Sequence, residues 1–220
     1  MTSDGSLDFA WMRRALYTAV VADVLDALGL REQVIDLELR CVSGAAVLVG
    51  RAKTTLWEEI DQIDPRPYEL ELKAVDECRA DEVLIVAAGG STRSGVWGEL
   101  LSTAARNRRC AGVIVDGAVR DVVKMNEMGF TVFARSTCPR DSLHRQRVVA
   151  VDIGLEMGGV RIEPGDLVLA DADGAVVLPR AVECEALAKA MEKVTAENRV
   201  RDEIRAGMKA TEAFRKYGVL

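Results

Sequence analysis

Histidine is almost absent from this sequence: the 220 residues include only one, His144. This excludes a zinc or iron site built from several imidazoles of one chain, and any Ser-His-Asp or Cys-His catalytic group would depend on that single residue. The polar segment around His144 contains no nucleophile-elbow pattern. The five cysteines are scattered, odd in number and form no CxxC pair, which argues for reduced thiols and against a zinc knuckle or a disulfide framework.

Long apolar runs are missing as well. No run reaches the roughly 18 residues that a membrane span needs. The first residues, MTSDGSLDFAWMRR, lack the charged start and apolar stretch of a signal peptide. A net charge of −6 gives no electrostatic footprint for nucleic acid, and neither a P-loop nor a GxGxxG motif is present. We therefore expect a cytoplasmic, soluble protein with no membrane and no nucleic-acid partner.

The patterns that are present predict a mixed α/β architecture. The apolar run DEVLIVAAGG (81–90) and the stretch 113–116 are typical of buried strands, and residues 145–179 alternate as in antiparallel sheet. We also predict helices over 9–30, 68–78 and 99–109, a strand–bend–strand unit at 43–57 with its bend at Gly50, a Ser/Thr/Gly loop at 91–97, and a short helix, Gly129 and a strand over 125–136.

The C-terminal segment predicts a long charged helix from Ala181 to about Ala206, with a narrow apolar stripe. Such a helix can lie on its own body or reach a neighbouring subunit, and we favour the neighbour. The length suits one domain with an appendage. We therefore divide the chain into an α/β domain, residues 1–180, and an intersubunit helical arm, residues 181–220.

An adjacent cation and anion end one predicted strand. VIVDGAVRD (113–121) runs from β-branched residues into Arg120 and Asp121. Neighbouring side chains of a strand point to opposite faces, so the pair is not a local ion pair by default. Either both charges are solvated in a loop, or the loop presents a cation and an anion to one ligand.

A second segment, GVWGELL (95–101), passes from a glycine-containing loop into a helix. Free N–H groups and the helix dipole form an anion site at such a start, and Gly98 would let a ligand approach the backbone. Alternatively, Glu99 is simply an acid that the helix dipole favours in the first turn of a helix. One α/β step can return Arg120 and Asp121 beside Gly98, so that Arg120 clamps an oxyanion while Asp121 and Glu99 hold a hard cation.

These segments carry a resemblance to a known family. GELLSTAARNRRCAGVIVDGAVRD (98–121) resembles the signature of the RraA-like family, which includes class II 4-hydroxy-4-methyl-2-oxoglutarate/4-carboxy-4-hydroxy-2-oxoadipate aldolases. The family pattern of an acid, twenty residues and Arg-Asp falls on Glu99, Arg120 and Asp121. The segments VVADVLDALG, VGRAKT and GGVRIEPGDLVLADADGAVVLP are also similar to the family, so the resemblance covers most of the chain.

The resemblance implies a role for each matching residue. Asp121 would bind Mg²⁺ (or Mn²⁺ or Co²⁺) directly, Glu99 would hold the ion through a water, and Arg120 would stabilise a pyruvate enolate. The backbone amides that would cradle the pyruvate carboxylate belong to Gly98, Glu99, Leu100 and Leu101.

The resemblance also implies a larger assembly. Its fold would be a swivelling phosphohistidine-type β/β/α layered domain, assembled as a homotrimer or a dimer of trimers with sites between subunits. An acid on the neighbouring subunit's C-terminal helix would complete the metal's ligands; Glu197 is the best match and Glu192 the second.

The implied activity is that of a lyase. A 4-hydroxy-2-oxo diacid would be cleaved to pyruvate, and oxaloacetate decarboxylation would be a side activity because loss of CO₂ leaves the same enolate.

Glu99 departs from the aspartate often found at its position, and GGSTRSGVWGE (89–99) is reminiscent of a branch that inhibits ribonuclease E. A protein-binding regulator without catalysis, or an enzyme for a different 2-oxo or hydroxy acid, is therefore an alternative; Asp121 and the arm favour the aldolase. The role of Arg93 stays open, and Lys124 is an alternative Schiff-base residue.

Overall fold

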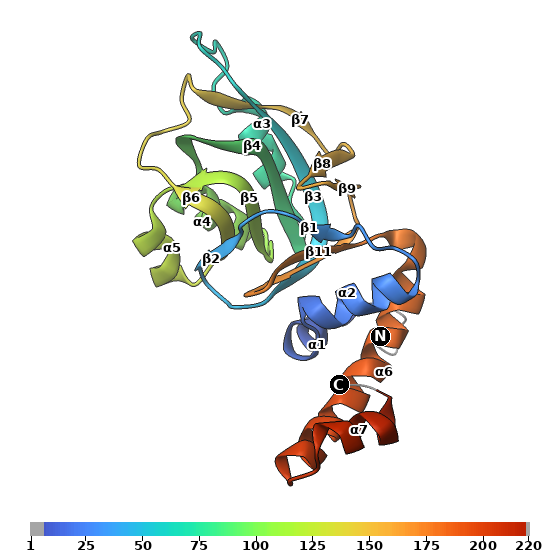
Figure 1. The fold of residues 1–220 in the computed structure, drawn as a ribbon. Coiled ribbons are helices and arrows are strands. Elements are labelled where there is room, and N and C mark those ends of the chain that lie inside the picture. The colour runs from blue at the N-terminus through green and yellow to red at the C-terminus, as the bar shows by residue number, and fades with distance from the viewer. Residues whose placement is uncertain (1–6, 219–220) are drawn as a thin grey trace.

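The computed structural model describes residues 7–218, which form a mixed α/β fold around a nine-stranded sheet (Figure 1). The strands follow the order β1 (Val34–Ile35), β11 (Gly174–Leu178), β10 (Leu167–Asp171), β3 (Leu48–Glu59), β4 (Glu82–Trp97), β5 (Gly112–Val119), β6 (Thr131–Thr137) and β2 (Arg40–Ser43), and β7 (Gln146–Val151) also pairs with β3. The central strands β3, β4, β5 and β6 run parallel. A separate hairpin consists of β8 (Leu155–Met157) and β9 (Val160–Ile162).

Both faces of the parallel strands are covered. The described helices are α1 (Phe9–Ala15), α2 (Thr18–Ala27), α3 (Glu69–Asp76), α4 (Glu99–Asn107), α5 (Val122–Met128), the 3₁₀ turn Arg180–Val182, α6 (Glu183–Arg205) and α7 (Ala210–Tyr217). In β4, Leu84 packs into the cluster shared with α3, α4 and α5, whereas its neighbour Ile85 packs into the cluster shared with the β8–β9 hairpin. This alternation buries both faces and explains why residues 83–88 of the strand are apolar at every position rather than at every second one.

The predicted mixed α/β class is confirmed, with three corrections in detail. The helix predicted over 9–30 is two helices, because Tyr17 has an extended backbone (φ −142°, ψ 158°) between α1 and α2. Gly50 causes no bend; it lies inside β3, where the missing side chain admits the backbone carbonyl of Asp81. The loop predicted at 91–97 is wrong because β4 continues to Trp97, pairing irregularly with β5, and this pairing outweighs the loop-like composition. The swivelling arrangement stays a prediction.

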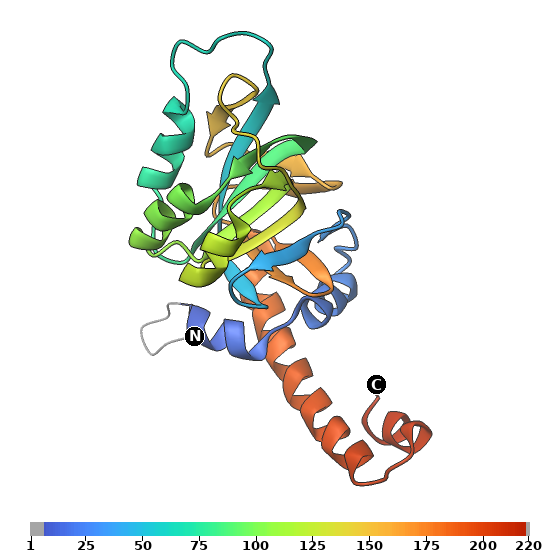
Figure 2. The ribbon, with the colours of Figure 1, turned by 90° about the vertical axis from the view of Figure 1, so that its left-hand side faces the viewer.

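The predicted C-terminal helix is present as α6, which extends away from the sheet and leads to α7 (Figure 2). Its first half packs on its own chain: Ala186, Leu187 and Ala190 share an apolar cluster with α2 and the β10–β11 hairpin. The second half carries mostly charged side chains. The division at residue 180 and an intersubunit role of the arm stay predictions.

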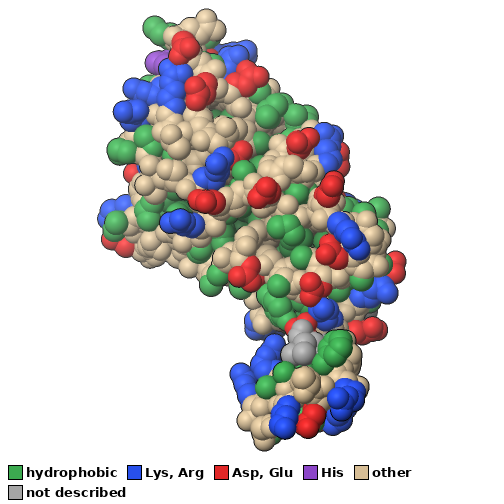
Figure 3. Space-filling view, in the orientation of Figure 1, with side chains coloured by type: hydrophobic (Ala, Val, Ile, Leu, Met, Phe, Trp, Pro, Cys, Tyr) green, Lys and Arg blue, Asp and Glu red, His purple; other side chains and the backbone are tan. Residues whose placement is uncertain are grey.

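The surface shown in Figure 3 carries charges of both signs. Lysine and arginine side chains are interspersed with aspartate and glutamate on this face, so no broad field of one sign covers it. Between residues 7 and 218, no helix combines the length and the apolar character needed to cross a membrane.

Replacing Asp171 with alanine should destabilise the fold. Asp171 ends β10 at the two-residue turn to β11, and its buried carboxylate accepts hydrogen bonds from the N–H (2.7 Å) and the hydroxyl (2.6 Å) of Thr18 at the start of α2. Losing both bonds should lower the free energy of unfolding by about 2 kcal/mol, measured by urea denaturation. Asp173→Ala, in the exposed turn, should change it by less than about 0.5 kcal/mol; equal effects would contradict this account.

Candidate functional site

The end of β5 presents Arg120 and Asp121. All eight residues of β5 are buried, so the chain leaves the core only at Arg120. Asp121 then adopts a left-handed backbone conformation (φ 57°, ψ 32°), which aspartate tolerates better than most residues. This turn brings its Oδ2 to 3.6 Å from Arg120 Nε. The two adjacent charges therefore do contact each other, because Asp121 has left strand geometry.

The start of α4 lies against this pair. Gly98 joins β4 to α4, the Glu99 N–H donates to Asp121 Oδ2 at 3.3 Å, and the Arg120 N–H donates to the Trp97 carbonyl at 2.8 Å. A Cβ added to Gly98 would lie 2.6 Å from Asp121 Oδ2 and 3.0 Å from Arg120 Cγ. Glycine is therefore required here by close approach rather than by backbone strain.

These groups face a cavity of about 230 Å³, called the site cavity below. It is lined by Tyr68, Glu71, Leu72, Gly95, Val96, Trp97, Gly98, Leu100, Leu101, Arg120, Asp121, Asp141 and Ser142. The structure thus brings together five of the residues singled out from the sequence. Glu99 contributes its backbone, while its carboxylate accepts a hydrogen bond from the Thr103 hydroxyl at 3.1 Å along α4. The space suits a ligand of small-metabolite size.

Four polar residues of the site cavity were not anticipated from the sequence: Tyr68, Glu71, Asp141 and Ser142. Asp141 Oδ2 accepts a hydrogen bond from Arg120 Nη1 at 2.9 Å, and its Oδ1 accepts one from the Tyr68 hydroxyl at 2.8 Å. Glu71, in the first turn of α3, is buried with only 7% of its surface exposed. One sequence signal existed for Glu71: it shares the buried face of the predicted helix with Ala74 and Val75, at i+3 and i+4.

Burial and charge shift the acidities of three of these groups. Burial, and then the charge of Asp141, raises the pKa of Glu71 to about 8, against the opposing effect of Arg120. Burial and the hydrogen bond to Asp141 raise the pKa of Tyr68 to about 12. Burial works to raise the pKa of Asp141, but hydrogen bonds from Leu143 N–H and Tyr68, together with Arg120, lower it overall. At neutral pH the cavity therefore holds a largely protonated Glu71 beside an ionised Asp141.

Glu71 should make the stability of the protein depend on pH. Its pKa is higher in the folded chain, so between about pH 4.5 and about pH 8 the unfolded state loses this proton and the folded state keeps it. The free energy of unfolding should fall across that window, and Glu71→Gln should flatten the fall in urea titrations at several pH values. Glu69→Gln, an exposed change on the same helix, should keep the wild-type slope. An unchanged slope in Glu71→Gln would contradict the shift.

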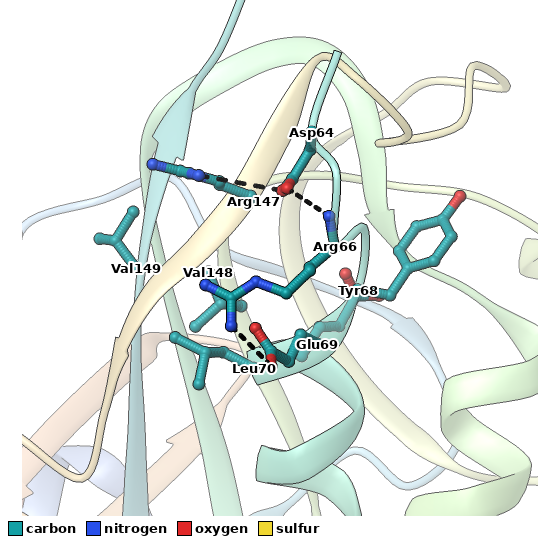
Figure 4. Close-up of a pocket in the computed structure, with 9 residues that line it drawn as sticks. Asp64, Arg66, Tyr68, Glu69, Leu70, Arg147, Val148 and Val149 are labelled. Carbon is teal, nitrogen blue, oxygen red and sulfur yellow. Dashed lines mark hydrogen bonds and ion pairs between the residues drawn. The ribbon is translucent and has the colours of Figure 1, made fainter. Parts of the chain in front are cut away.

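A neighbouring cavity of about 200 Å³ shares Tyr68 and Glu71 with the site cavity (Figure 4). Its cations are already paired: Arg66 Nη1 lies 3.2 Å from Glu69 Oε1, and Arg147 Nη1 lies 4.0 Å from Asp64 Oδ2. In Figure 4 the ring of Tyr68 points away from these ion pairs. Its hydroxyl therefore belongs to the site cavity, where it donates a hydrogen bond to Asp141.

The site cavity offers part of a site for a hard cation. Asp121 has a partly exposed carboxylate, and Glu99, whose carboxylate bonds to the Thr103 hydroxyl, begins the adjoining helix. Mg²⁺ commonly takes one or two carboxylates and keeps several waters, so this donor set fits it. No cluster of three or more His, Cys, Asp or Glu suited to a metal occurs within residues 7–218.

The proposed third acid is elsewhere in the chain. Glu197 on α6 accepts a hydrogen bond from the Tyr17 hydroxyl and lies 3.8 Å from Lys193 Nζ. It lines a separate cavity between α2 and α6, and Glu192 is exposed on the same helix. Neither residue belongs to the site cavity of its own chain.

Two further charged residues also lie outside the site cavity. Arg93 forms ion pairs with Asp61 at 2.6 Å and with Glu59 at 3.5 Å. These pairs link β4 to the end of β3 and to the loop that follows it. Lys124 pairs with Glu127 at 3.0 Å on the exposed side of α5. Lys124 is therefore placed poorly for a Schiff base with a ligand in the cavity.

The fold and the site together define an α/β protein with a small pocket lined by a helix start, an arginine, a tyrosine and carboxylates. The family model of the RraA-like proteins, described as Aldolase/RraA, matches residues 18–177, so the chain belongs to this family. The family resemblance of the sequence is thereby confirmed.

Relatives with assigned names include aldolases. A putative 4-hydroxy-4-methyl-2-oxoglutarate aldolase of Halalkalibacterium halodurans is 29% identical over 191 residues, covering 87% of this chain and 86% of that protein. The 4-hydroxy-4-methyl-2-oxoglutarate aldolase of Thermus thermophilus is 32% identical over 150 residues, covering 67% and 85%. Among solved structures, Streptomyces coelicolor RraAS2, an unusual member of the RNase ES inhibitor RraA family, has a TM-score of 0.76 at 26% identity and covers 89% of this chain and 98% of that chain.

Proposed function

We propose that this protein is a divalent-metal-dependent pyruvate aldolase, a lyase that cleaves a 4-hydroxy-2-oxo acid and also decarboxylates oxaloacetate. The observation that carries the proposal is the junction at Gly98, where the start of α4, the Arg120 guanidinium and the Asp121 carboxylate face one cavity. The aldolase names of relatives at about 30% identity support the reaction class. A diacid is the substrate that the family resemblance implies.

The chain's own groups suit the two ends of such a substrate. The first N–H groups of α4, at Leu100 and Leu101, have no intrahelical partners and can hold the substrate carboxylate. When the C3–C4 bond breaks, the C4 hydroxyl loses its proton and the electron pair remains as the enolate of pyruvate; a proton then returns to C3. Arg120, oriented by Asp141, can stabilise the developing oxyanion.

The cation would be held by Asp121 and, through water, by Glu99. A bound Mg²⁺, Mn²⁺ or Co²⁺ supplies a Lewis acid for the 2-oxo group. Asp121 offers a carboxylate inside the cavity, and the Glu99 side chain would have to turn from Thr103 toward the ion. The same cation would serve oxaloacetate, since its decarboxylation forms the same enolate.

We propose a trimer or a dimer of trimers in which another copy closes the site cavity. Leu72 and Leu100, which line it, are 52% and 75% exposed, and Val123 on the next helix is 70% exposed. Exposed apolar side chains around a cavity are typical of a surface that another chain covers. Glu197 of a second copy would then be the third acid. Light scattering that shows a monomer would contradict this assembly.

The testing experiment measures pyruvate released from oxaloacetate, from 4-hydroxy-4-methyl-2-oxoglutarate and from 2-keto-3-deoxygluconate. Each assay is run with chelator-treated protein, with and without added Mg²⁺. Metal-dependent pyruvate from any of the three supports the proposal. No pyruvate from all three, with folded protein and saturating Mg²⁺, Mn²⁺ and Co²⁺ in turn, would overturn it.

Regulation of ribonuclease E by protein binding is the second candidate. It is favoured by the structural similarity to RraAS2 and to the RNA-processing inhibitor RraA of Thermus thermophilus, which has a TM-score of 0.61 at 31% identity. This function needs no metal and no cavity chemistry. Inhibition of ribonuclease E by the metal-free protein, without pyruvate release, would select it over the aldolase.

A further inference from the structure

The lining of the site cavity carries more acids than cations. Its polar side chains include Tyr68, Glu71 and Asp141. Within the described residues, Arg120 is the only lysine or arginine that lines the cavity. Arg120 is already engaged, with Nη1 donating to Asp141 at 2.9 Å and Nε 3.6 Å from Asp121. No uncommitted cation of this chain therefore faces the part of a substrate beyond its reacting carbons.

Glu71 is a buried acid without a hydrogen-bond partner in the described part of the chain. Its side chain lines the cavity and is more than nine-tenths buried. Among the described residues no protein group occupies the carboxyl, so it is free to pair with a group that enters the cavity. Because its pKa is raised to about 8, the carboxyl at neutral pH has both an O–H donor and acceptor oxygens. A hydroxyl group can pair with both at once.

We infer that the substrate is a 4-hydroxy-2-oxo acid whose tail beyond C4 carries hydroxyl groups, as in 2-keto-3-deoxy sugar acids, rather than a second carboxylate. This inference rests on the proposed aldolase function and narrows its substrate class. The tail hydroxyls pair with Glu71, Asp141 and Tyr68, while the carbon chain lies along Leu72 and Leu100. A second carboxylate would face the Asp141 charge in a partly desolvated cavity, which disfavours diacids.

The neighbouring cavity is where a diacid would have to find a cation. Arg66 and Arg147 line it, on the far side of the shared residues Tyr68 and Glu71. Both are held in ion pairs, with Glu69 and Asp64 respectively. A diacid would have to displace these pairs, so we expect it to be the poorer substrate.

The test compares kcat/KM for pyruvate release from 2-keto-3-deoxygluconate and from 4-hydroxy-4-methyl-2-oxoglutarate under identical Mg²⁺ conditions. The wild-type protein should favour the hydroxylated substrate by at least about tenfold. Glu71→Leu removes the pairing and should lower kcat/KM for that substrate by about tenfold while changing the diacid value by less than about twofold. Glu71→Gln keeps a donor and an acceptor and should retain the preference. Glu69→Leu, exposed on the same helix, should behave as wild type.

The possible outcomes are distinct. Preference of the wild type for the diacid would overturn the inference and leave the aldolase function standing. A preference that survives in Glu71→Leu would overturn the assigned role of Glu71. No pyruvate from either substrate or from oxaloacetate would remove the proposed function, and the inference with it. Circular dichroism and thermal unfolding confirm that each variant is folded before its kinetics are compared.

Discussion

Asp121→Asn is expected to abolish metal-dependent pyruvate release, lowering kcat/KM by at least about 10³-fold. Asp121 is the carboxylate that meets both Arg120 Nε and the Glu99 N–H at the site cavity. Asparagine has nearly the same shape but no charge, so it should bind Mg²⁺ poorly. The measurement is pyruvate release against Mg²⁺ concentration, together with Mg²⁺ binding by calorimetry.

Asparagine tests the charge of Asp121 more cleanly than alanine does. Asp121 has a φ of 57°, and alanine in that left-handed conformation costs about 1–2 kcal/mol, whereas asparagine tolerates it. A loss of activity in Asp121→Asn therefore reports on charge and not on backbone strain.

Asp152→Asn is the matched control for this variant. Asp152 also has a positive φ, of 55°, and pairs with Lys53 away from the site cavity. It should keep full activity. Wild-type Mg²⁺ dependence in Asp121→Asn would exclude Asp121 as the metal ligand.

Arg120→Lys is expected to lower kcat by about 10²-fold, even though the positive charge is kept. The guanidinium bonds to Asp141 through Nη1 and approaches Asp121 through Nε, a fork that a single ammonium cannot reproduce. If Arg120 stabilises the enolate oxygen, its loss should affect the transition state more than substrate binding. Steady-state kinetics should therefore show a large fall in kcat with a smaller change in KM.

Arg140→Lys provides the control for Arg120. Arg140 is exposed on the loop beside the site and does not line the cavity. Its replacement should leave both constants unchanged. A raised KM with an unchanged kcat in Arg120→Lys would instead mean that Arg120 only binds the substrate, and the enolate role would be withdrawn.

Local sequence patterns predicted much of the fold because the residues that favour each of these helices and strands are close together in the sequence. The β-branched run before Asp116 predicts a buried strand, and Gly129 predicts the end of a helix; the structure has β5 and the end of α5 there. Prediction failed where a partner strand decides the outcome. Residues 91–97 have loop composition but pair with β5, and only the neighbouring strand supplies the hydrogen bonds that make them part of β4.

The sequence by itself determined the α/β class and the family resemblance, since both rest on local patterns and motifs along the chain; it also predicted that Glu99, Arg120 and Asp121 belong to one site. Only the tertiary structure decided which acids share the cavity. Tyr68 and Asp141 lie 73 residues apart, and their contact depends on how α3 and the loop before β7 pack. No local pattern encodes such a distance. The tertiary fold likewise buries Glu71, because desolvation depends on every neighbour that excludes water.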